Sequence, residues 1–249
     1  MRTELRFRDD AYLRSTPARV LGVMPWSASP ETATQSALLL DRTVCYFESG
    51  GQPGDRGQIA WSGGNTPILD TRRDRASGEV LHIVASDAPL PAVGEEVVVT
   101  LDWARRHLHM RYHTALHLMC AALPGILATG NAIDTTKARI DFDLSGVAFD
   151  RDATEARLNA LIAGNHEVTT QWITDEEMAA QPELVRTMSV APPTGAGRVR
   201  LLSIGPGVDL QPCGGTHVAN TREIGPVAIV KVENKGKQNR RVVIQLRSA

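Results

Sequence analysis

Two histidines with the spacing of metal ligands stand in the segment His113-Thr114-Ala115-Leu116-His117. In an α-helix, four residues carry the chain about 40° past a full turn, so both imidazoles would lie on one face. Neutral imidazoles placed in this way can bind one metal ion. His109 lies four residues before His113, so the spacing alone leaves open whether the pair is His109–His113 or His113–His117.

A second cluster of metal-ligand residues lies in Cys213-Gly214-Gly215-Thr216-His217. The two glycines let a short turn fold so that the thiolate and the imidazole reach one point. Two nitrogen donors from the helix and the two donors of this turn complete a tetrahedral set that suits Zn²⁺. The sequence therefore predicts a zinc site built from two distant segments.

The residues around the ligands exclude several known types of zinc protein. No glutamate lies between His113 and His117, so the pattern of the metalloproteases is absent. The His-x-Glu and Cys-x-x-Cys pieces of the nucleobase deaminases are absent as well. The two ligand pairs are too far apart in sequence for a zinc finger.

The composition is that of an ordinary soluble protein: hydrophobic residues make up 42%, charged residues 22%, and the formal net charge is −1. No apolar run reaches the length of about 18 residues that a membrane span needs, and the first residues lack the apolar stretch of a secretory signal. We therefore expect a cytoplasmic protein with no membrane partner. Three scattered cysteines are poor material for a disulfide framework. The net charge gives no overall positive electrostatic potential that would attract nucleic acid. Basic residues do cluster locally, and local clusters are enough to bind phosphates.

Residues 1–100 have the pattern of short strands separated by turns. The apolar runs cover residues 18–23, 43–47, 80–84 and 96–101. Strands at this spacing predict a small β-barrel or sandwich. The glycine-rich segment 48–57 would let the backbone come close to another segment or to a ligand.

Residues 101–249 mix helix and strand patterns. Asp102 is expected to cap a helix that ends near Leu123, and a second helix is predicted over 152–164, with Asp152 and Glu155 placed like a capping box. The predicted strands cover residues 167–173 and 199–204 and a hairpin from 227 to 246 with its turn at 234–237. We therefore predict an α+β fold class, with an N-terminal β-barrel domain over 1–100 and an α+β domain over 101–249.

The two ligand motifs resemble the editing site of alanyl-tRNA synthetase and of the free-standing editing proteins of the AlaX family. Segment 48–57 resembles the glycine-rich motif of the β-barrel domain that precedes the editing domain. Segment 130–142 resembles the strand region after the histidine-bearing helix, and segment 234–241 resembles the C-terminal part of AlaX. The chain has no room for an aminoacylation domain, and it has the barrel region that the shortest AlaX forms lack. It is therefore similar to the medium-length AlaX type.

This resemblance implies a tRNA-synthetase-type editing domain and a zinc-dependent deacylase that acts in trans. The implied substrate is tRNA(Ala) mischarged with serine, with glycine as a second candidate, whereas correctly charged Ala-tRNA(Ala) is spared. The implied ligands of the Zn²⁺ cofactor are His113, His117, Cys213 and His217.

Further roles are predicted around these ligands. The backbone amides of Gly214 and Gly215 are candidates to stabilise an oxyanion, and no residue stands out as the general base. Asp209 and Gln211 are candidates to hydrogen-bond a ligand histidine. The candidate substrate contacts are Ser49, Gly50, Gly51, Gln52, Thr114, Asn131 and Thr216. The candidate tRNA contacts are Lys137, Arg139, Lys235, Lys237, Arg240 and Arg241.

Two other functions fit the same motifs. The zinc could be purely structural in an RNA-binding module that cleaves nothing. The site could also belong to a zinc hydrolase of a small ester, which needs no basic surface. The sequence predicts no particular oligomeric state.

Overall fold

The computed structural model of the chain describes residues 3–29, 34–144, 147–185, 197–236 and 239–247. The chain divides into two compact units. The first unit contains Met1–Ser49 and Pro53–His107, and the second contains Gly50–Gln52 and Leu108–Ala249. Within the described residues, none of the helices combines the length and the apolar character that crossing a membrane requires.

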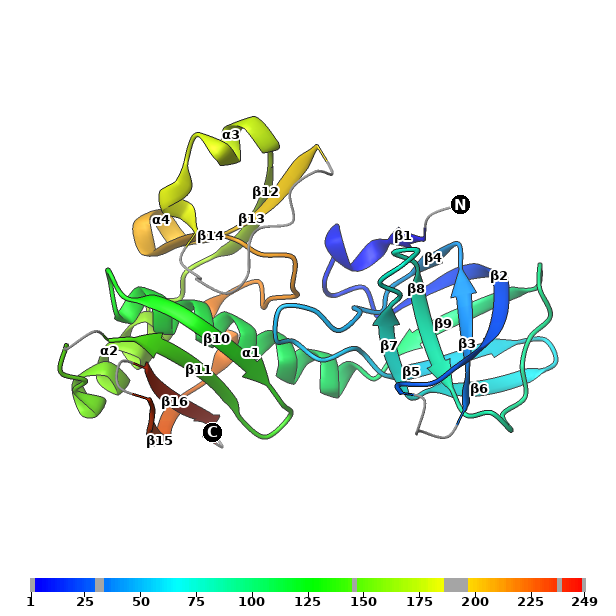
Figure 1. Cartoon of the computed structure of the whole chain (residues 1–249), viewed down its shortest axis with the longest axis horizontal. Coiled ribbons are helices and arrows are strands. Elements are labelled where there is room, and N and C mark those ends of the chain that lie inside the picture. Colours follow the sequence, from blue (N-terminus) through cyan, green and yellow to red (C-terminus); the bar gives the residue numbers. More distant parts are fainter. Residues whose placement is uncertain (1–2, 30–33, 145–146, 186–196, 237–238, 248–249) are drawn as a thin grey trace. The chain divides into compact units, whose positions relative to one another are not determined.

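The first unit consists mainly of a seven-stranded sheet (Figure 1). Its strands pair in the order β6-β5-β9-β2-β3-β8-β7, and all neighbouring strands in this sheet are antiparallel. Their bounds are β2 Ser15–Trp26, β3 Gln35–Leu40, β5 Gly57–Trp61, β6 Gly64–Ile68, β7 Asp70–Arg73, β8 Val80–Val84 and β9 Glu96–Leu101. A two-stranded parallel pair joins β1 (Glu4–Leu5) to β4 (Arg42–Thr43), and a 3₁₀ turn η1 covers Arg6–Arg8.

The expected β-barrel is not confirmed, because β6 and β7 stand at the two ends of an open order of strands. Strand β9 shows the alternation on which the strand prediction rested, since Val97, Val99 and Leu101 are buried and the residues between them are exposed. Alternation of this kind identifies strands, but it does not determine whether the first and last strands pair.

The segment 44–47 was expected to continue a strand, and this expectation is wrong, since β4 ends at Thr43. Three of its backbone groups bind side chains in place of a neighbouring strand, and the carbonyl of Tyr46 accepts from the backbone N–H of Asp55 over 2.9 Å. Tyr46 N–H donates to Oδ2 of Asp55 over 2.6 Å, and the carbonyl of Val44 accepts from Nη2 of Arg106 over 2.7 Å. The apolar run is therefore buried without being a strand.

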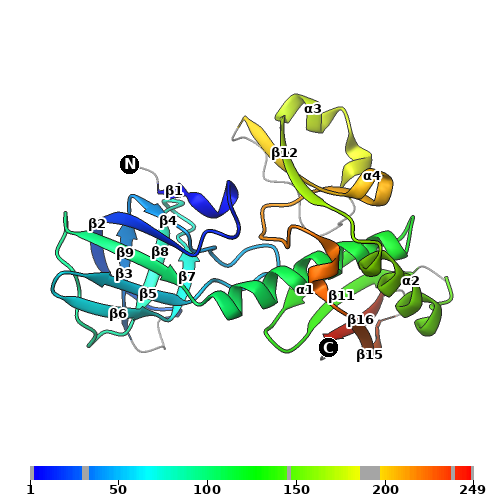
Figure 2. The same ribbon diagram turned by 180° about the vertical axis from the view of Figure 1, so that it is seen from behind.

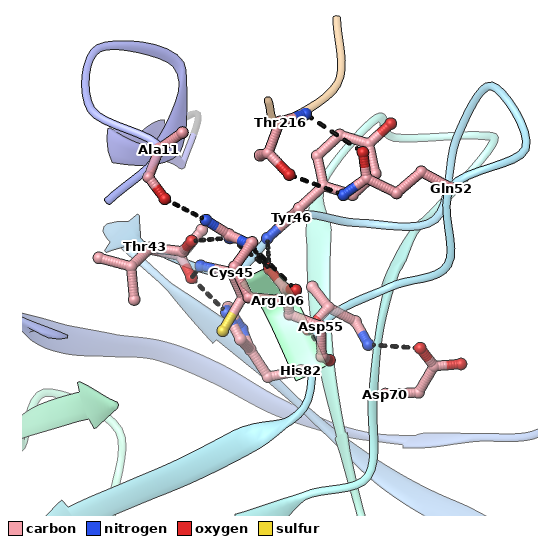
Figure 3. Close-up of polar contacts among 12 residues, drawn as sticks. Ala11, Thr43, Cys45, Tyr46, Gln52, Asp55, Asp70, His82, Arg106 and Thr216 are labelled. Atoms are coloured by element: carbon pink, nitrogen blue, oxygen red, sulfur yellow. Dashed lines mark hydrogen bonds and ion pairs between the residues drawn. The ribbon is translucent and has the colours of Figure 1, made fainter. Parts of the chain in front are cut away.

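Arg106 and Asp55 form a fully buried ion pair in the first unit (Figure 3). Nε of Arg106 donates to Oδ2 of Asp55 over 2.9 Å, and Nη1 donates to the carbonyl of Ala11 over 3.0 Å. A buried pair is tolerated only when such hydrogen bonds satisfy both partners. The pair thus ties the glycine-rich segment to the first part of helix α1.

Helix α1 (Trp103–Ala122) carries the predicted histidine pair. Asp102 accepts from the N–H of Arg105 over 3.1 Å, which confirms it as the helix cap. Gly125, with φ of +79°, follows the last turn and lets the chain leave the helix. In the second unit, the N–H of Leu246 donates to the hydroxyl of Tyr112 over 3.3 Å, and α1 runs along a sheet in both views (Figures 1 and 2).

That sheet has four antiparallel strands in the order β10-β11-β16-β15, and it includes the predicted C-terminal hairpin. The strands are β10 Leu127–Ile133, β11 Ala138–Asp143, β15 Val227–Lys235 and β16 Asn239–Leu246. On β11 and β16, Ile140, Phe142 and Val242 are buried. Alternation therefore places Asp141 and Arg241 on the opposite face.

Helix α2 (Arg151–Ala163) covers the edge strand β15. Its cap is Asp150, whose side chain accepts from the N–H of Ala153 over 3.0 Å, so the predicted capping box of Asp152 and Glu155 is wrong. Glu155 is used elsewhere, because its carboxylate accepts from the N–H of Ile229 over 2.7 Å. This contact satisfies a backbone donor that an edge strand would otherwise expose.

A second, three-stranded antiparallel sheet has the order β12-β13-β14. The strands are β12 Val168–Thr174, β13 Arg198–Ile204 and β14 Asp209–Pro212. Short helical turns lie nearby at α3 Asp175–Ala179, η2 Pro182–Leu184, α4 Gly205–Val208 and η3 Thr221–Ile224. Because β14 ends at Pro212, this sheet leads directly into the Cys213 turn.

Candidate metal centre

Helix α1 and the turn after β14 bring four ligand side chains together in the second unit. His113, His117, Cys213 and His217 each offer one donor atom, and these atoms all lie within 4.8 Å of one another. His109 is fully buried and does not belong to the group, so the pair left open by spacing is His113–His117. The structure therefore joins the two motifs at a site that could hold a metal ion.

Two separations between the donor atoms are close to those of a tetrahedral zinc site. Bonds of about 2.0 Å to nitrogen and 2.3 Å to sulfur place neighbouring ligand atoms roughly 3.3–3.6 Å apart. Sγ of Cys213 lies 3.6 Å from Nε2 of His113 and 3.2 Å from Nε2 of His217. Three imidazoles and one thiolate also have the donor chemistry that zinc prefers.

Hydrogen bonds determine which nitrogen of His113 carries its proton. Oε1 of Gln52 accepts from the backbone N–H of Thr216 over 3.1 Å, and Nε2 of Gln52 donates to the hydroxyl of Thr216 over 2.8 Å (Figure 3). These two contacts fix the orientation of the amide, because a backbone N–H can only donate. Nδ1 of His113 lies 2.8 Å from the same Oε1 and must donate to it. The lone pair of His113 is therefore on Nε2, which faces Cys213.

The other two histidines are held in the same tautomer. Nδ1 of His117 lies 2.9 Å from Oδ2 of Asp209, and an ionised carboxylate only accepts. Nδ1 of His217 lies 3.2 Å from the hydroxyl of Thr114, which itself donates to the carbonyl of Met110 over 3.0 Å. All three Nε2 atoms are thereby left to bind metal, an arrangement typical of histidine ligands.

The predicted contact between Asp209 and a ligand histidine is confirmed. Gln211 contacts no ligand histidine through its side-chain amide in the described hydrogen bonds; it donates to Oδ1 of Asp209 over 2.7 Å. Thr114, expected to contact substrate, uses its hydroxyl proton for Met110 and also accepts from the N–H of Val218 over 3.3 Å. It therefore has no donor left for a substrate hydroxyl and acts as a support for His217.

Charges within the cluster favour the metal-binding form of the thiol. Burial raises the pKa of Cys213, but His113 and His217 outweigh it and bring that pKa well below the usual range. Burial lowers the pKa of His217 to about 3, with repulsion from His113 adding to the effect. For His117, burial is opposed by the hydrogen bonds to Asp209 and Cys213, which raise its pKa to about 10. A metal ion would therefore compete with a proton for His117.

Gly215 has no room for a side chain, whereas Gly214 does. A Cβ atom on Gly215 would lie 2.2 Å from Cε1 of His113 and 2.9 Å from Oε1 of Gln52. A Cβ atom on Gly214 would meet nothing within 4 Å in the described structure, and Gly214 is exposed. The two glycines of the motif therefore have different physical roles.

Arg200, which the sequence reasoning missed, holds the same turn from the other side. Its Nη1 donates to the carbonyl of Cys213 over 3.1 Å and to the carbonyl of Gly215 over 2.9 Å. The available signal was the place of this arginine between Val199 and Leu201 of β13, because a buried cation needs several polar partners.

The glycine-rich segment contributes three residues to the second unit, namely Gly50, Gly51 and Gln52. The carbonyl of Gly51 accepts from the N–H of Ile133 over 2.9 Å, so this segment lies along β10. A Cβ atom on Gly51 would lie 1.8 Å from Oδ1 of Asn131, which explains the glycine. Ser49 belongs to the first unit, where it is exposed and its carbonyl accepts from the hydroxyl of Tyr46.

The predicted tRNA contacts differ in their exposure and in whether a carboxylate already pairs with them. Lys137 and Lys235 are exposed. Arg139 and Arg241 both bind Asp141, over 2.8 and 2.7 Å. The remaining two are Arg240, which is half-buried on β16, and Lys237, which lies outside the described residues.

Comparison with known proteins identifies the family. Residues 199–243 match the family described as threonyl and alanyl tRNA synthetase second additional domain, and residues 17–105 match the family of tRNA synthetases class II (A). The alanyl-tRNA editing protein AlaX-M of Methanosarcina mazei is 33% identical over 98% of this chain and 96% of its own length.

Longer relatives share the same region. The alanyl-tRNA editing protein AlaX-L of Pyrococcus horikoshii is 32% identical over 92% of this chain and 54% of its own length. The alanine–tRNA ligase of Pyrobaculum arsenaticum is 31% identical over 93% of this chain and 25% of its own length. The match to AlaX-M extends over nearly the whole of both chains, and this chain belongs to the family of alanyl-tRNA editing proteins.

Proposed function

We propose that this protein hydrolyses the ester between tRNA(Ala) and a wrong amino acid, serine or glycine, and that it acts in trans. The observation that carries the proposal is the convergence of His113, His117, Cys213 and His217, with their donor atoms within 4.8 Å of one another. The names of the relatives as alanyl-tRNA editing proteins supply the substrate class. We assign the reaction to residues 101–249 together with Gln52.

The proposed cofactor is Zn²⁺, held by the four clustered side chains. When bound, zinc would supply a Lewis acid, and because four side chains fill a tetrahedral shell, the ester oxygen would have to enter as a fifth ligand or replace one of the four. Gln52, Asp209 and Thr114 keep the three imidazoles in the tautomer that presents Nε2. Their part is to hold the ligands in place before substrate arrives, which avoids reorganisation during the reaction.

The exposed side of the cluster is the proposed place of the reacting ester. Gly214 is exposed beside the ligands, and its backbone amide is the proposed donor to the developing oxyanion. On the side of Gly51, Oδ1 of Asn131 is buried and has no hydrogen-bond partner among the described residues. We propose Asn131 as a contact for the serine hydroxyl, because a site with a polar group of this kind disfavours alanine, which would leave it unpaired. Ser49, Gly50 and Gly51 stay proposed contacts of the same substrate.

The test is a deacylation assay with zinc-loaded protein and four substrates: Ser-tRNA(Ala), Gly-tRNA(Ala), Ala-tRNA(Ala) and a free seryl ester. We expect release of serine or glycine from the tRNA and little release of alanine. Equal cleavage of the free ester would indicate a small-ester hydrolase. Binding of tRNA without cleavage of any substrate would indicate an RNA-binding module with a structural metal.

The Cys213→Ser variant distinguishes a hydrolase whose metal serves the reaction from an RNA-binding module whose metal is purely structural. If the metal serves the reaction, the variant should stay folded by circular dichroism and lose activity. If the metal is purely structural, the variant should unfold.

A further inference from the structure

The side chain of Arg200 reaches from β13 to the metal-ligand turn and is almost completely buried, at 7% exposed. A single atom, Nη1, donates to the carbonyl of Cys213 over 3.1 Å and to the carbonyl of Gly215 over 2.9 Å. The N–H of Cys213 in turn donates to the backbone carbonyl of Arg200 over 3.0 Å. Arg200 therefore fixes both the start and the middle of the turn.

These contacts determine where two backbone amides point. In a planar trans peptide, the C=O of one residue and the N–H of the next point in opposite directions. Since the carbonyls of Cys213 and Gly215 both point to Nη1 of Arg200, the N–H groups of Gly214 and Thr216 both point away from it. Arg200 thus orients two of the amides in the turn without touching either.

Only one of these two amides remains available. The N–H of Thr216 donates to Oε1 of Gln52 over 3.1 Å. The N–H of Gly214 forms no hydrogen bond in the part of the chain that the structure describes, and its residue is exposed beside Cys213. A Cβ atom on Gly214 would meet nothing within 4 Å there, so the space in front of this residue is open.

We propose that Arg200 is the positioning residue that presents the Gly214 amide to the reacting carbonyl. The proposal rests on the proposed deacylase function, for which it names the residue that prepares the oxyanion donor. Arg200 itself does not touch the substrate. It holds the Cys213–Gly214 peptide in one of its two orientations, with the N–H outward and the carbonyl inward.

A fixed orientation is needed here because the turn contains two consecutive glycines. Glycine populates both signs of φ at little cost, so the peptide before Gly214 could rotate and point its carbonyl outward. A carbonyl in that place would repel a developing oxyanion, whereas an N–H stabilises it. The two hydrogen bonds from Arg200 favour the productive orientation.

The test compares Arg200→Met and Arg200→Lys with Arg198→Met in zinc-loaded protein. Arg198 is the matched control, because it lies on the same strand and its guanidinium rests over Trp172, 4.4 Å from the ring centre. We expect Arg200→Met to lower kcat for Ser-tRNA(Ala) by roughly 100-fold, the effect of losing one oxyanion donor, with KM changed less than about threefold. Arg200→Lys should lose less, because lysine keeps the charge and can still bind one carbonyl. Arg198→Met should match the wild type.

A second measurement, by NMR spectroscopy, reports the orientation of the Cys213–Gly214 peptide and does not depend on enzymatic activity. In zinc-loaded protein labelled at Cys213 and Gly214, the carbonyl ¹³C shift of Cys213 and the amide ¹⁵N shift of Gly214 should both move in Arg200→Lys. They should stay in place in Arg198→Met.

The outcomes separate this proposal from the proposed function. A wild-type protein that releases no amino acid from any tRNA would refute the function, while the labelled shifts would still report the orientation. An active wild type together with an Arg200→Met variant that binds zinc and keeps its kcat would overturn the role of Arg200. Loss of zinc in both Arg200 variants but not in Arg198→Met would also overturn it, because Arg200 would then serve the metal site as a whole.

Discussion

Oε1 of Gln52 accepts a hydrogen bond from Nδ1 of His113 over 2.8 Å, although 61 positions separate the two residues in the chain. Removing this acceptor should weaken metal binding, because groups that orient ligand histidines are typically worth roughly 10–100-fold in affinity. We expect that loss of zinc affinity in Gln52→Met, measured by competition with a chelator. Gln58→Met is the matched control, since Gln58 is exposed on β5 and should leave the affinity unchanged.

Gly215→Ala and Gly214→Ala should behave differently although they change neighbouring residues in the same way. The added methyl group on residue 215 would collide with the ring of His113, whereas the one on residue 214 has open space. Overpacking of this kind costs about 1–3 kcal/mol and would displace a ligand. The zinc content per protein and the temperature of thermal unfolding should both decrease in Gly215→Ala and stay unchanged in Gly214→Ala. Normal zinc content in Gly215→Ala would contradict the packing of His113 on this turn.

Arg106→Met should strongly destabilise the protein. It leaves the carboxylate of Asp55 buried without its cation, and breaking a buried pair in this way costs about 3–5 kcal/mol. Arg19→Met removes an exposed pair with Glu96 and should cost less than about 1 kcal/mol. Chemical denaturation of both variants tests the difference. An equal decrease in the free energy of unfolding in both variants would mean that burial does not determine how much the Arg106 pair stabilises the protein.

Stability should fall in mild acid because of His82. Burial lowers the pKa of this histidine from 6.5 to about 4. Between these pH values the unfolded chain binds a proton that the folded chain does not. The free energy of unfolding therefore has its full value above pH 6.5 and decreases as the pH falls towards 4. The loss amounts to about 3 kcal/mol. Denaturation at pH 7 and pH 4.5 measures it.

His82→Gln should flatten this pH dependence. Glutamine does not titrate, and its amide can donate to the carbonyl of Leu38 and accept from the hydroxyl of Thr43, the two partners of the imidazole. His107→Gln is the control, because His107 is only half-buried. A pH dependence that persists unchanged in His82→Gln would assign the effect to other groups.

The exposed lysines should dominate the salt dependence of tRNA binding. Each phosphate contact contributes roughly 0.7–0.9 to the slope of log affinity against log salt concentration. Lys137→Ala and Lys235→Ala should each reduce the slope by about that amount, whereas Arg139→Ala should have a smaller effect because Asp141 already pairs with it. Lys231→Ala, which removes an exposed lysine paired with Glu233, serves as the control. Unchanged slopes in both lysine variants would place the phosphate contacts elsewhere.

The sequence predicted the elements that follow from local pattern. The cap at Asp102, the helix that carries His113 and the antiparallel hairpin of β15 and β16 are all present. Local pattern failed at segment 44–47, where side chains of distant residues replace a neighbouring strand. It also placed the cap of α2 two residues too late, because Asp150 and Asp152 are chemically equivalent candidates.

The metal cluster was predictable because its ligands are rare residue types at recognisable spacings. The groups that orient them were harder to find. Asp209 lies close to Cys213 in sequence and was expected. Arg200 acts through two backbone carbonyls, so its position within an apolar run was the signal available in the sequence. Gln52 was expected to contact substrate. It binds His113 and Thr216 because the glycine-rich segment lies along β10, which the sequence does not predict.

The unit that holds the ligands is not a continuous stretch of sequence. Its three-residue contribution from Gly50–Gln52 means that a protein shortened to begin at residue 108 would lack the acceptor for His113 and the backbone carbonyl that pairs with Ile133. Such a fragment should bind metal poorly and expose an uncovered stretch of β10. Adding the missing segment back as a separate peptide would then be a direct way to restore the site.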